Sequence, residues 1–130
     1  MSDRFPCPCC GHRVLGTFGF YEICPICRWE DDVSQLRWVT SLGQNGTSLV
    51  QAQRNYMEFG VSDEKWRSHS RRPFLDEHID PAWRPVDLRR DSFEDPSDTS
   101  VPPAPWPEDQ LTLCWWLPTF WRRVSLLPPG

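Results

Sequence analysis

Two Cys-x-x-Cys pairs limit the folds open to this chain more than any other feature of its sequence. Cys7 and Cys10 form the first pair, Cys24 and Cys27 form the second, and 13 residues separate them. A zinc ion takes four thiolate ligands at about 2.3 Å in a tetrahedral array, and a Cys-x-x-Cys turn directs two sulfurs toward one ion. We therefore expect these four cysteines to hold one Zn²⁺ ion per chain. Iron in a rubredoxin-like site uses the same four thiolates, so the sequence leaves the metal open between zinc and iron.

Two other uses of paired cysteines compete with metal binding. Six cysteines in 130 residues would suit a disulfide-rich secreted domain, but the segment Met1–Pro6 carries charge and shows no apolar signal-peptide core. A redox Cys-x-x-Cys stands at the start of a helix, whereas Pro6, Pro8 and Gly11 surround the first pair here. We therefore expect reduced, metal-bound thiols in the cytoplasm.

Two further cysteines lie outside these pairs. Cys9 lies between the two cysteines of the first pair, and we expect it to pack beside the metal site or to point away from it. The alternative is a reactive thiol whose pKa is lowered by the neighbouring cation. Cys114 lies in an aromatic stretch, which favours a buried, apolar thiol.

The residues around and after the cysteine pairs predict a small α+β domain stabilised by metal. Segments 13–16 and 17–23 are β-prone, which favours zinc-ribbon-like β-hairpins leading into each cysteine turn. Ser48 is a good helix N-cap, apolar residues follow it at helical spacing, and Gly60 ends the pattern. A second short helix is expected from Ser62 to about residue 70. Such a module has too little apolar bulk for a large core, so we expect metal binding to supply much of its folding free energy.

The acidic run Glu30–Asp32 invites a catalytic or hard-metal interpretation. Adjacent carboxylates point in different directions along a regular backbone, whereas general acid–base catalysis needs a pair at fixed separation in a shaped pocket. We therefore interpret the run as a solvated turn that caps a helix or pairs with an arginine.

Composition divides the chain into three parts. Residues 1–75 hold the cysteine pairs and the expected helices, residues 76–110 form an acidic, Pro-rich linker, and residues 111–130 are rich in tryptophan. The linker cannot bury a core of its own. The last part concentrates apolar side chains but is too short and too interrupted for a membrane span, so we expect it to dock on the first domain. The alternative is an exposed segment that binds a partner.

Three motifs resemble those of the bacterial cysteine-rich CPCC domain proteins. They are CPCCG at 7–11, YEICPIC followed by WEDD across 21–32, and NGTSL followed by QAQRNYMEFG across 45–60. The sequence differs from the family pattern at Thr47, where valine is expected, and this mild change leaves the helix N-cap intact. The resemblance implies a zinc-ribbon-like module without an established activity.

The sequence favours binding over catalysis. It carries no phosphate loop, dinucleotide fingerprint or HExxH motif, so we expect a protein that is not an enzyme. The expected role is a zinc-binding module that contacts another protein. A toxin-neutralising, immunity-like protein is one form of this role, because a small acidic protein suits a basic partner.

Two other functions stay open. Nucleic-acid binding through the ribbon and the basic cluster of Arg67, Arg71 and Arg72 is less favoured, because the net charge is −4. A thiol redox protein would use Cys9 beside the metal. The sequence predicts no membrane segment, and it does not determine the oligomeric state.

Overall fold

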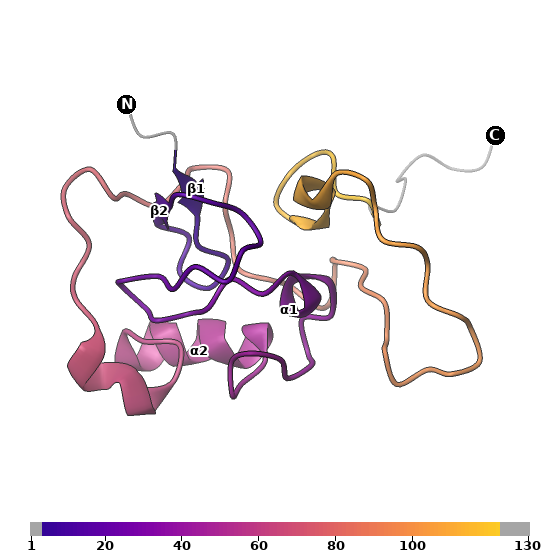
Figure 1. Ribbon diagram of the computed structural model, residues 1–130, viewed down its shortest axis with the longest axis horizontal. Coiled ribbons are helices and arrows are strands. Elements are labelled where there is room, and N and C mark those ends of the chain that lie inside the picture. The colour runs from indigo at the N-terminus through magenta and orange to yellow at the C-terminus, as the bar shows by residue number, and fades with distance from the viewer. Residues whose placement is uncertain (1–3, 123–130) are drawn as a thin grey trace.

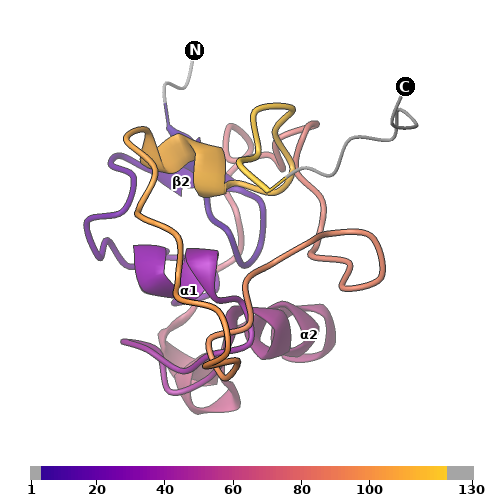
Figure 2. The same ribbon diagram turned by 90° about the vertical axis from the view of Figure 1, so that its right-hand side faces the viewer.

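The computed structural model describes residues 4–122 (Figure 1). Its elements, in chain order, are β1 (Phe5–Pro6), β2 (Arg13–Leu15), α1 (Val33–Arg37), α2 (Leu49–Phe59) and the 3₁₀ helices η1 (Glu64–His69) and η2 (Gln110–Leu113). The two strands form an antiparallel sheet, and η2 lies above α1 and contacts it (Figures 1 and 2). Within residues 4–122, no helix combines the length and apolar character needed to cross a membrane. The predicted small α+β class is confirmed.

The β-hairpin encloses the first cysteine turn. Phe5 pairs with Leu15 and Pro6 pairs with Arg13, and the register shifts between the two pairs, as at a β-bulge. Leu15 is buried in the core, whereas Arg13 is partly exposed. The hairpin therefore holds the first turn at its closed end.

The expected second hairpin is reduced to a single bridge between Ile23 and Glu30. Segment 17–23 does not form the predicted strand, because Gly19 and Tyr21 have positive φ values of 77° and 62°. A strand requires extended backbone at every residue. The second cysteine turn therefore follows an irregular loop.

The helix α2 follows its predicted sequence signals. Ser48 caps its N-terminus by accepting a hydrogen bond from the Gln51 amide, and Gly60 ends it in the left-handed conformation at φ 79°. Leu49 and Ala52 face the core and have no exposed surface. Both cap predictions are confirmed.

The second predicted helix forms as η1. It is a 3₁₀ helix whose N-cap is Asp63 and whose C-cap is Ser70. Its position agrees with the prediction to within two residues, and its hydrogen-bonding pattern is tighter than that of an α-helix.

Two of the three residues of the acidic run after the second cysteine pair are buried, so its interpretation as a solvated turn is wrong. Asp31 has no exposed surface and Asp32 is 4% exposed. The helix-capping part of that interpretation is confirmed, because Asp32 is the N-cap of α1 and accepts a hydrogen bond from the Ser34 amide. With five residues, α1 is too short for apolar periodicity to reveal it.

A buried polar network holds loop 41–47 against α1. The Gln35 side chain donates to the carbonyl oxygens of Ser41 and Thr47 at 3.0 and 2.8 Å. Its Oε1 accepts from the backbone and side-chain amides of Asn45 at 3.1 and 2.8 Å. Because both donors and both acceptor positions of this amide are paired, Gln35 can be buried without an unsatisfied group.

Asp31 is a buried carboxylate with a single hydrogen bond. Its Oδ2 accepts from the Gly19 amide at 2.6 Å, and its Oδ1 has no partner among the described residues. Burial, together with the charges of Glu22 and Asp32, raises the pKa of Asp31 from 3.8 to about 6. The folded protein therefore holds this proton more tightly than the unfolded chain. The contribution of this proton to the free energy of unfolding is fully present below pH 3.8 and is lost as the pH rises through about 6.

Replacing Asp31 with asparagine is expected to stabilise the protein at pH 8, because the variant buries no charge there. The difference between the folded and unfolded pKa values of Asp31 limits the gain in free energy of unfolding to about 3 kcal/mol. We expect a gain on the order of 2 kcal/mol, because the new NH₂ group lacks a hydrogen-bond partner. The gain should be about 1 kcal/mol smaller at pH 5.5. Urea denaturation of both proteins at both pH values measures it. A gain that does not change with pH would show that the carboxylate charge is not its cause.

Side chains from all three predicted parts of the chain meet in one core. Trp29 and Leu36 pack there with Leu113 and Trp115, and each is at most 1% exposed. The partly buried side chains that the middle part adds to this core are Trp83, Val86 and Phe93. The three predicted boundaries stay a prediction, and residues 123–130 of the last part lie outside the described residues.

Candidate metal centre

The structure brings the four paired cysteines together. The Sγ atom of Cys7 lies 3.6 Å from that of Cys27, and the Sγ atom of Cys10 lies 3.8 Å from that of Cys24. All four sulfurs lie within 4.8 Å of one another. Adjacent sulfurs are about 3.8 Å apart in a tetrahedral site with zinc–sulfur bonds of about 2.3 Å, whereas a disulfide bond measures about 2.05 Å. The sulfurs therefore have the spacing of metal ligands.

The two cysteine turns share one pattern of backbone hydrogen bonds. In the first turn, the Cys7 amide donates to the carbonyl five residues later at 2.9 Å, and the Gly11 amide donates back to the Cys7 carbonyl at 2.7 Å. In the second, Cys24 makes the equivalent bond at 2.9 Å, and the Arg28 amide donates to the Cys24 carbonyl at 2.9 Å. The same local scaffold therefore presents each pair of sulfurs.

Both turns place a left-handed residue at the same position. Gly11 has a φ of 80° and Arg28 has a φ of 69°. Glycine adopts this conformation freely, whereas a residue with a Cβ atom loses about 1 kcal/mol there. The Nε atom of Arg28 is also buried without a hydrogen-bond partner among residues 4–122. The second turn thus carries a strain that the first avoids.

Replacing Arg28 with glycine is expected to raise the free energy of unfolding by about 0.5–1 kcal/mol. The change removes the backbone strain and the unpaired nitrogen, and the greater freedom of the unfolded chain offsets part of the gain. Arg28→Ala is the control, because it removes the same guanidinium but keeps a Cβ atom in the left-handed region. Thermal denaturation of the three proteins measures the difference. A glycine variant less stable than the alanine variant would contradict the strain argument.

The protonation of the four sulfurs depends on a cation. Burial raises the pKa of Cys7 and Cys27, and hydrogen bonding with Cys24 raises the pKa of Cys10. Burial acts in the same direction on Cys24, but hydrogen bonds from the other three sulfurs outweigh it and hold the pKa of Cys24 well below its usual value. Without a cation, burial therefore works against the thiolate form at Cys7 and Cys27. A divalent cation would allow all four to be thiolates.

The helix α2 lies against the sulfur cluster. Burial raises the pKa of the Tyr56 hydroxyl, and the nearby charge of Cys10 acts in the same direction. The Gln53 side chain donates to the carbonyl of Pro8 in the first cysteine turn at 2.9 Å and accepts from the Val86 amide at 3.0 Å. One buried glutamine thus joins the first turn, α2 and a later loop.

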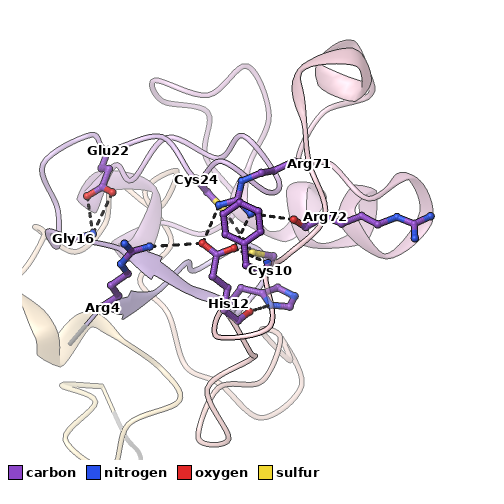
Figure 3. Close-up of polar contacts among 10 residues, drawn as sticks. Arg4, Cys10, His12, Gly16, Glu22, Cys24, Arg71 and Arg72 are labelled. Carbon is purple, nitrogen blue, oxygen red and sulfur yellow. Dashed lines mark hydrogen bonds and ion pairs between the residues drawn. The ribbon is translucent and has the colours of Figure 1, made fainter. Parts of the chain in front are cut away.

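An ion-pair network lies beside Cys24. The Glu77 carboxylate accepts hydrogen bonds from both terminal nitrogens of Arg71 at 2.6 and 2.8 Å, and an Arg4 nitrogen lies 3.6 Å from it. Figure 3 shows Arg71 reaching past Cys24 while Arg4 approaches from the opposite side. Hydrogen bonding to Arg71 holds the pKa of Glu77 below its usual range, although Glu77 is 2% exposed. Arg71, which binds Glu77, also places positive charge near the sulfurs and so favours their thiolate form.

The other two cysteines and His12 lie outside the four-sulfur cluster. Cys9 is 1% exposed and belongs to the same buried core. Cys114 is also buried there, which confirms the predicted apolar thiol, and burial raises its pKa. His12 Nδ1 lies 2.6 Å from the Glu77 carbonyl oxygen.

Two residues that support the cluster were not predicted from the sequence. Gln53 is 6% exposed and lies four residues after Leu49, so it shares the core-facing side of α2. A polar residue at an apolar position of the helical pattern was the signal that could have revealed it. Glu77 lies at the start of the expected linker, and no local pattern indicates its burial because Arg71 and Arg4 are its partners.

The comparison with protein families covers the region that holds this cluster. A model of the cysteine-rich CPCC family matches residues 5–77, which is more than half of the 130-residue chain. The chain belongs to the cysteine-rich CPCC family. The resemblance found in the three sequence motifs is thereby confirmed. No curated protein matches the chain.

The CPCC region of this protein is covered by residues that follow it. The region contains the four clustered sulfurs, the hairpin, α1, α2 and η1. Beyond its end at residue 77, the Asp80 amide donates to the Gly11 carbonyl at 2.9 Å, and the Trp83 ring packs against the same glycine. The CPCC fold of this chain therefore includes contacts from outside the matched residues.

Proposed function

We propose that this CPCC protein is a zinc-stabilised, non-enzymatic module that recognises another protein. The observation that carries the zinc assignment is the spacing of the sulfurs, with pairs at 3.6 and 3.8 Å, against about 3.8 Å in a tetrahedral zinc–thiolate site. Zinc is favoured over iron because a structural role needs no redox partner. Bound zinc would supply a cross-link between the two cysteine turns.

The composition of the cluster supports a structural role over a catalytic one. Catalytic zinc keeps one coordination position for water or substrate, whereas four protein thiolates close the tetrahedral shell. The four sulfur-bearing residues are at most 1% exposed, and they are Cys7, Cys10, Cys24 and Cys27. A substrate would have neither an open position on the metal nor a path to it.

Exposed apolar side chains support a role in protein binding. Phe20 and Tyr21 are 77% and 51% exposed, and Phe74 and Leu75 are 61% and 104% exposed. Large apolar side chains that lie next to one another in water commonly mark contact surfaces. The Trp-rich C-terminal segment has less support as a contact surface, because its Trp115 is buried.

The other candidate functions have less support. Arg71 is bound to Glu77 and Arg67 lies 3.4 Å from Glu64, so two of the three arginines of the basic cluster already have acidic partners. Cys9 is buried, which disfavours a reactive thiol. A toxin-neutralising role remains one form of the proposed protein recognition. We place the protein in the reducing cytoplasm, where metal-bound thiolates persist.

Native mass spectrometry of the untagged protein tests the zinc assignment. We expect one zinc per chain, with a mass shift that disappears on treatment with a strong chelator under reducing conditions. Iron in place of zinc, or a protein that carries no metal when purified under reducing conditions, would contradict the assignment.

Site-specific cross-linking tests the partner assignment. A photo-reactive amino acid at Phe74 should give one discrete adduct with another protein in cells that express the zinc-loaded chain at low level. The control places the same amino acid at Gln51, an exposed position on α2. Identical adduct patterns from both positions, or none from Phe74, would contradict a specific contact there.

A further inference from the structure

A guanidinium lies buried among three tryptophans at the end of α1. The Arg37 side chain is 1% exposed. Its guanidinium carbon lies 4.8 Å from the ring centre of Trp38, 4.6 Å from that of Trp106 and 4.9 Å from that of Trp121. Aromatic faces attract cations at these distances. Residues far apart in the sequence therefore form a buried binding site for the Arg37 guanidinium.

The charge of this arginine is neutralised within the same cluster. Arg37 Nε donates to Glu94 Oε1 at 2.5 Å, and its Nη2 donates to the Ala104 carbonyl at 2.5 Å. The Ala104 amide donates to the second Glu94 oxygen at 3.0 Å. These bonds hold segment 94–106 across α1, where it passes in front of the helix in Figure 2.

A pocket of about 320 Å³ opens beside the tryptophan cluster. Its lining includes the apolar residues Trp38, Pro102 and Pro103 and the acidic residues Glu94, Asp95 and Asp98. Two of these residues, Trp38 and Glu94, also contact Arg37. Two of the residues that hold the chain's own guanidinium thus also line the pocket.

The pocket carries uncompensated negative charge. Glu94 is neutralised by Arg37, and Arg122, which also lines the pocket, adds a second positive charge, so these five side chains leave one net negative charge at the pocket. Asp95 and Asp98 have no cationic partner among the described residues. Segment 91–121 as a whole contains six acidic and no basic residues.

The geometry of both aspartates leaves an oxygen available to a ligand. Asp95 Oδ1 accepts hydrogen bonds from the amide and hydroxyl of Ser97, and Asp98 Oδ1 accepts the same two bonds from Ser100. Hydrogen bonding to Ser100 holds the pKa of Asp98 below its usual value, so it is ionised at neutral pH. Neither Oδ2 atom accepts a hydrogen bond from residues 4–122.

We propose that this pocket binds an arginine side chain of a basic segment in the partner protein. Arginine suits the site better than lysine, because its planar guanidinium stacks on an aromatic ring and donates to two carboxylates at once. The inference rests on the proposed protein-binding function and names the partner chemistry. The proposed arginine site depends on the sulfur cluster only because the cluster keeps the chain folded.

Peptide binding to the zinc-loaded full chain tests the proposal. The probe is a fluorescein-labelled peptide of alternating glycine and arginine, and the comparison peptides replace arginine with lysine or glutamate. We expect the arginine peptide to bind at least about fivefold more tightly than the lysine peptide. We also expect Asp95→Asn/Asp98→Asn to weaken it at least about tenfold, as loss of a charge-assisted pair would.

A second double variant separates a built pocket from general attraction between opposite charges. Glu58→Gln/Asp76→Asn removes the same charge from two exposed positions outside the pocket. It should change arginine-peptide binding less than about twofold at 150 mM salt, where distant charges are screened. Equal weakening by both double variants, or equal affinity for the lysine peptide, would overturn the pocket assignment. So would absence of binding by a chain that carries its zinc, and this last result would leave the zinc assignment standing.

Discussion

Removal of the metal is expected to unfold residues 5–77. Zinc binding contributes on the order of 10 kcal/mol in small zinc peptides, and a small domain has only about 5–15 kcal/mol of stability in total. The two cysteine turns would then lose the link that joins them. Far-ultraviolet circular dichroism before and after a strong chelator, in the presence of reductant, measures the loss of helical signal.

The Cys24→Ser variant should reproduce this loss without a chelator. It removes one of the four clustered sulfurs, so one-to-one zinc binding should disappear. Cys114→Ser is the matched control, because it changes a buried cysteine outside the cluster and should keep zinc while losing some stability. A chelated protein with an unchanged spectrum would show that the fold does not depend on metal.

Replacing Gly11 with alanine is expected to lower the free energy of unfolding by about 3 kcal/mol. A Cβ atom there would lie 2.4 Å from Cε3 of Trp83, and the residue has a φ of 80°. Forcing the ring aside costs about 2 kcal/mol, and a Cβ atom in the left-handed region costs about 1 kcal/mol more. Urea denaturation of the zinc-loaded proteins measures the change.

Gly60 provides the control for this steric argument. It has nearly the same φ, 79°, but an added Cβ atom would meet nothing within 4 Å. Gly60→Ala should therefore lower the free energy of unfolding only by the cost of a Cβ atom in the left-handed region, about 1 kcal/mol. If the two alanine variants were equally stable, the contact between Gly11 and Trp83 would carry no energetic weight.

The features that the sequence predicted correctly are those with local causes. The caps of α2 depend on residues a few positions apart, with Ser48 accepting from the Gln51 amide and Gly60 adopting a left-handed φ. The grouping of the cysteines follows from the Cys-x-x-Cys spacing in the same way. These signals can be read without knowing where the rest of the chain lies.

The features that the sequence did not reveal depend on distant partners. Burial of Asp31 follows from the loop that folds back to place the Gly19 amide against it. The Arg37 cluster joins α1 to Glu94, which lies 57 positions away. Neither residue type is usually buried, so composition favours exposure at both positions. Both side chains are buried only because the whole chain packs around them.

The cover over the first cysteine turn has a consequence for when the metal enters. All four sulfurs precede the covering residues Asp80 and Trp83 in the chain, and synthesis proceeds from the N-terminus. The ion can therefore be captured by an open pair of turns on the ribosome, and the later residues then close over it. In the finished protein, Asp80 and Trp83 lie against the first turn. A metal ion held there would thus exchange more slowly than from a chain that ends at residue 77.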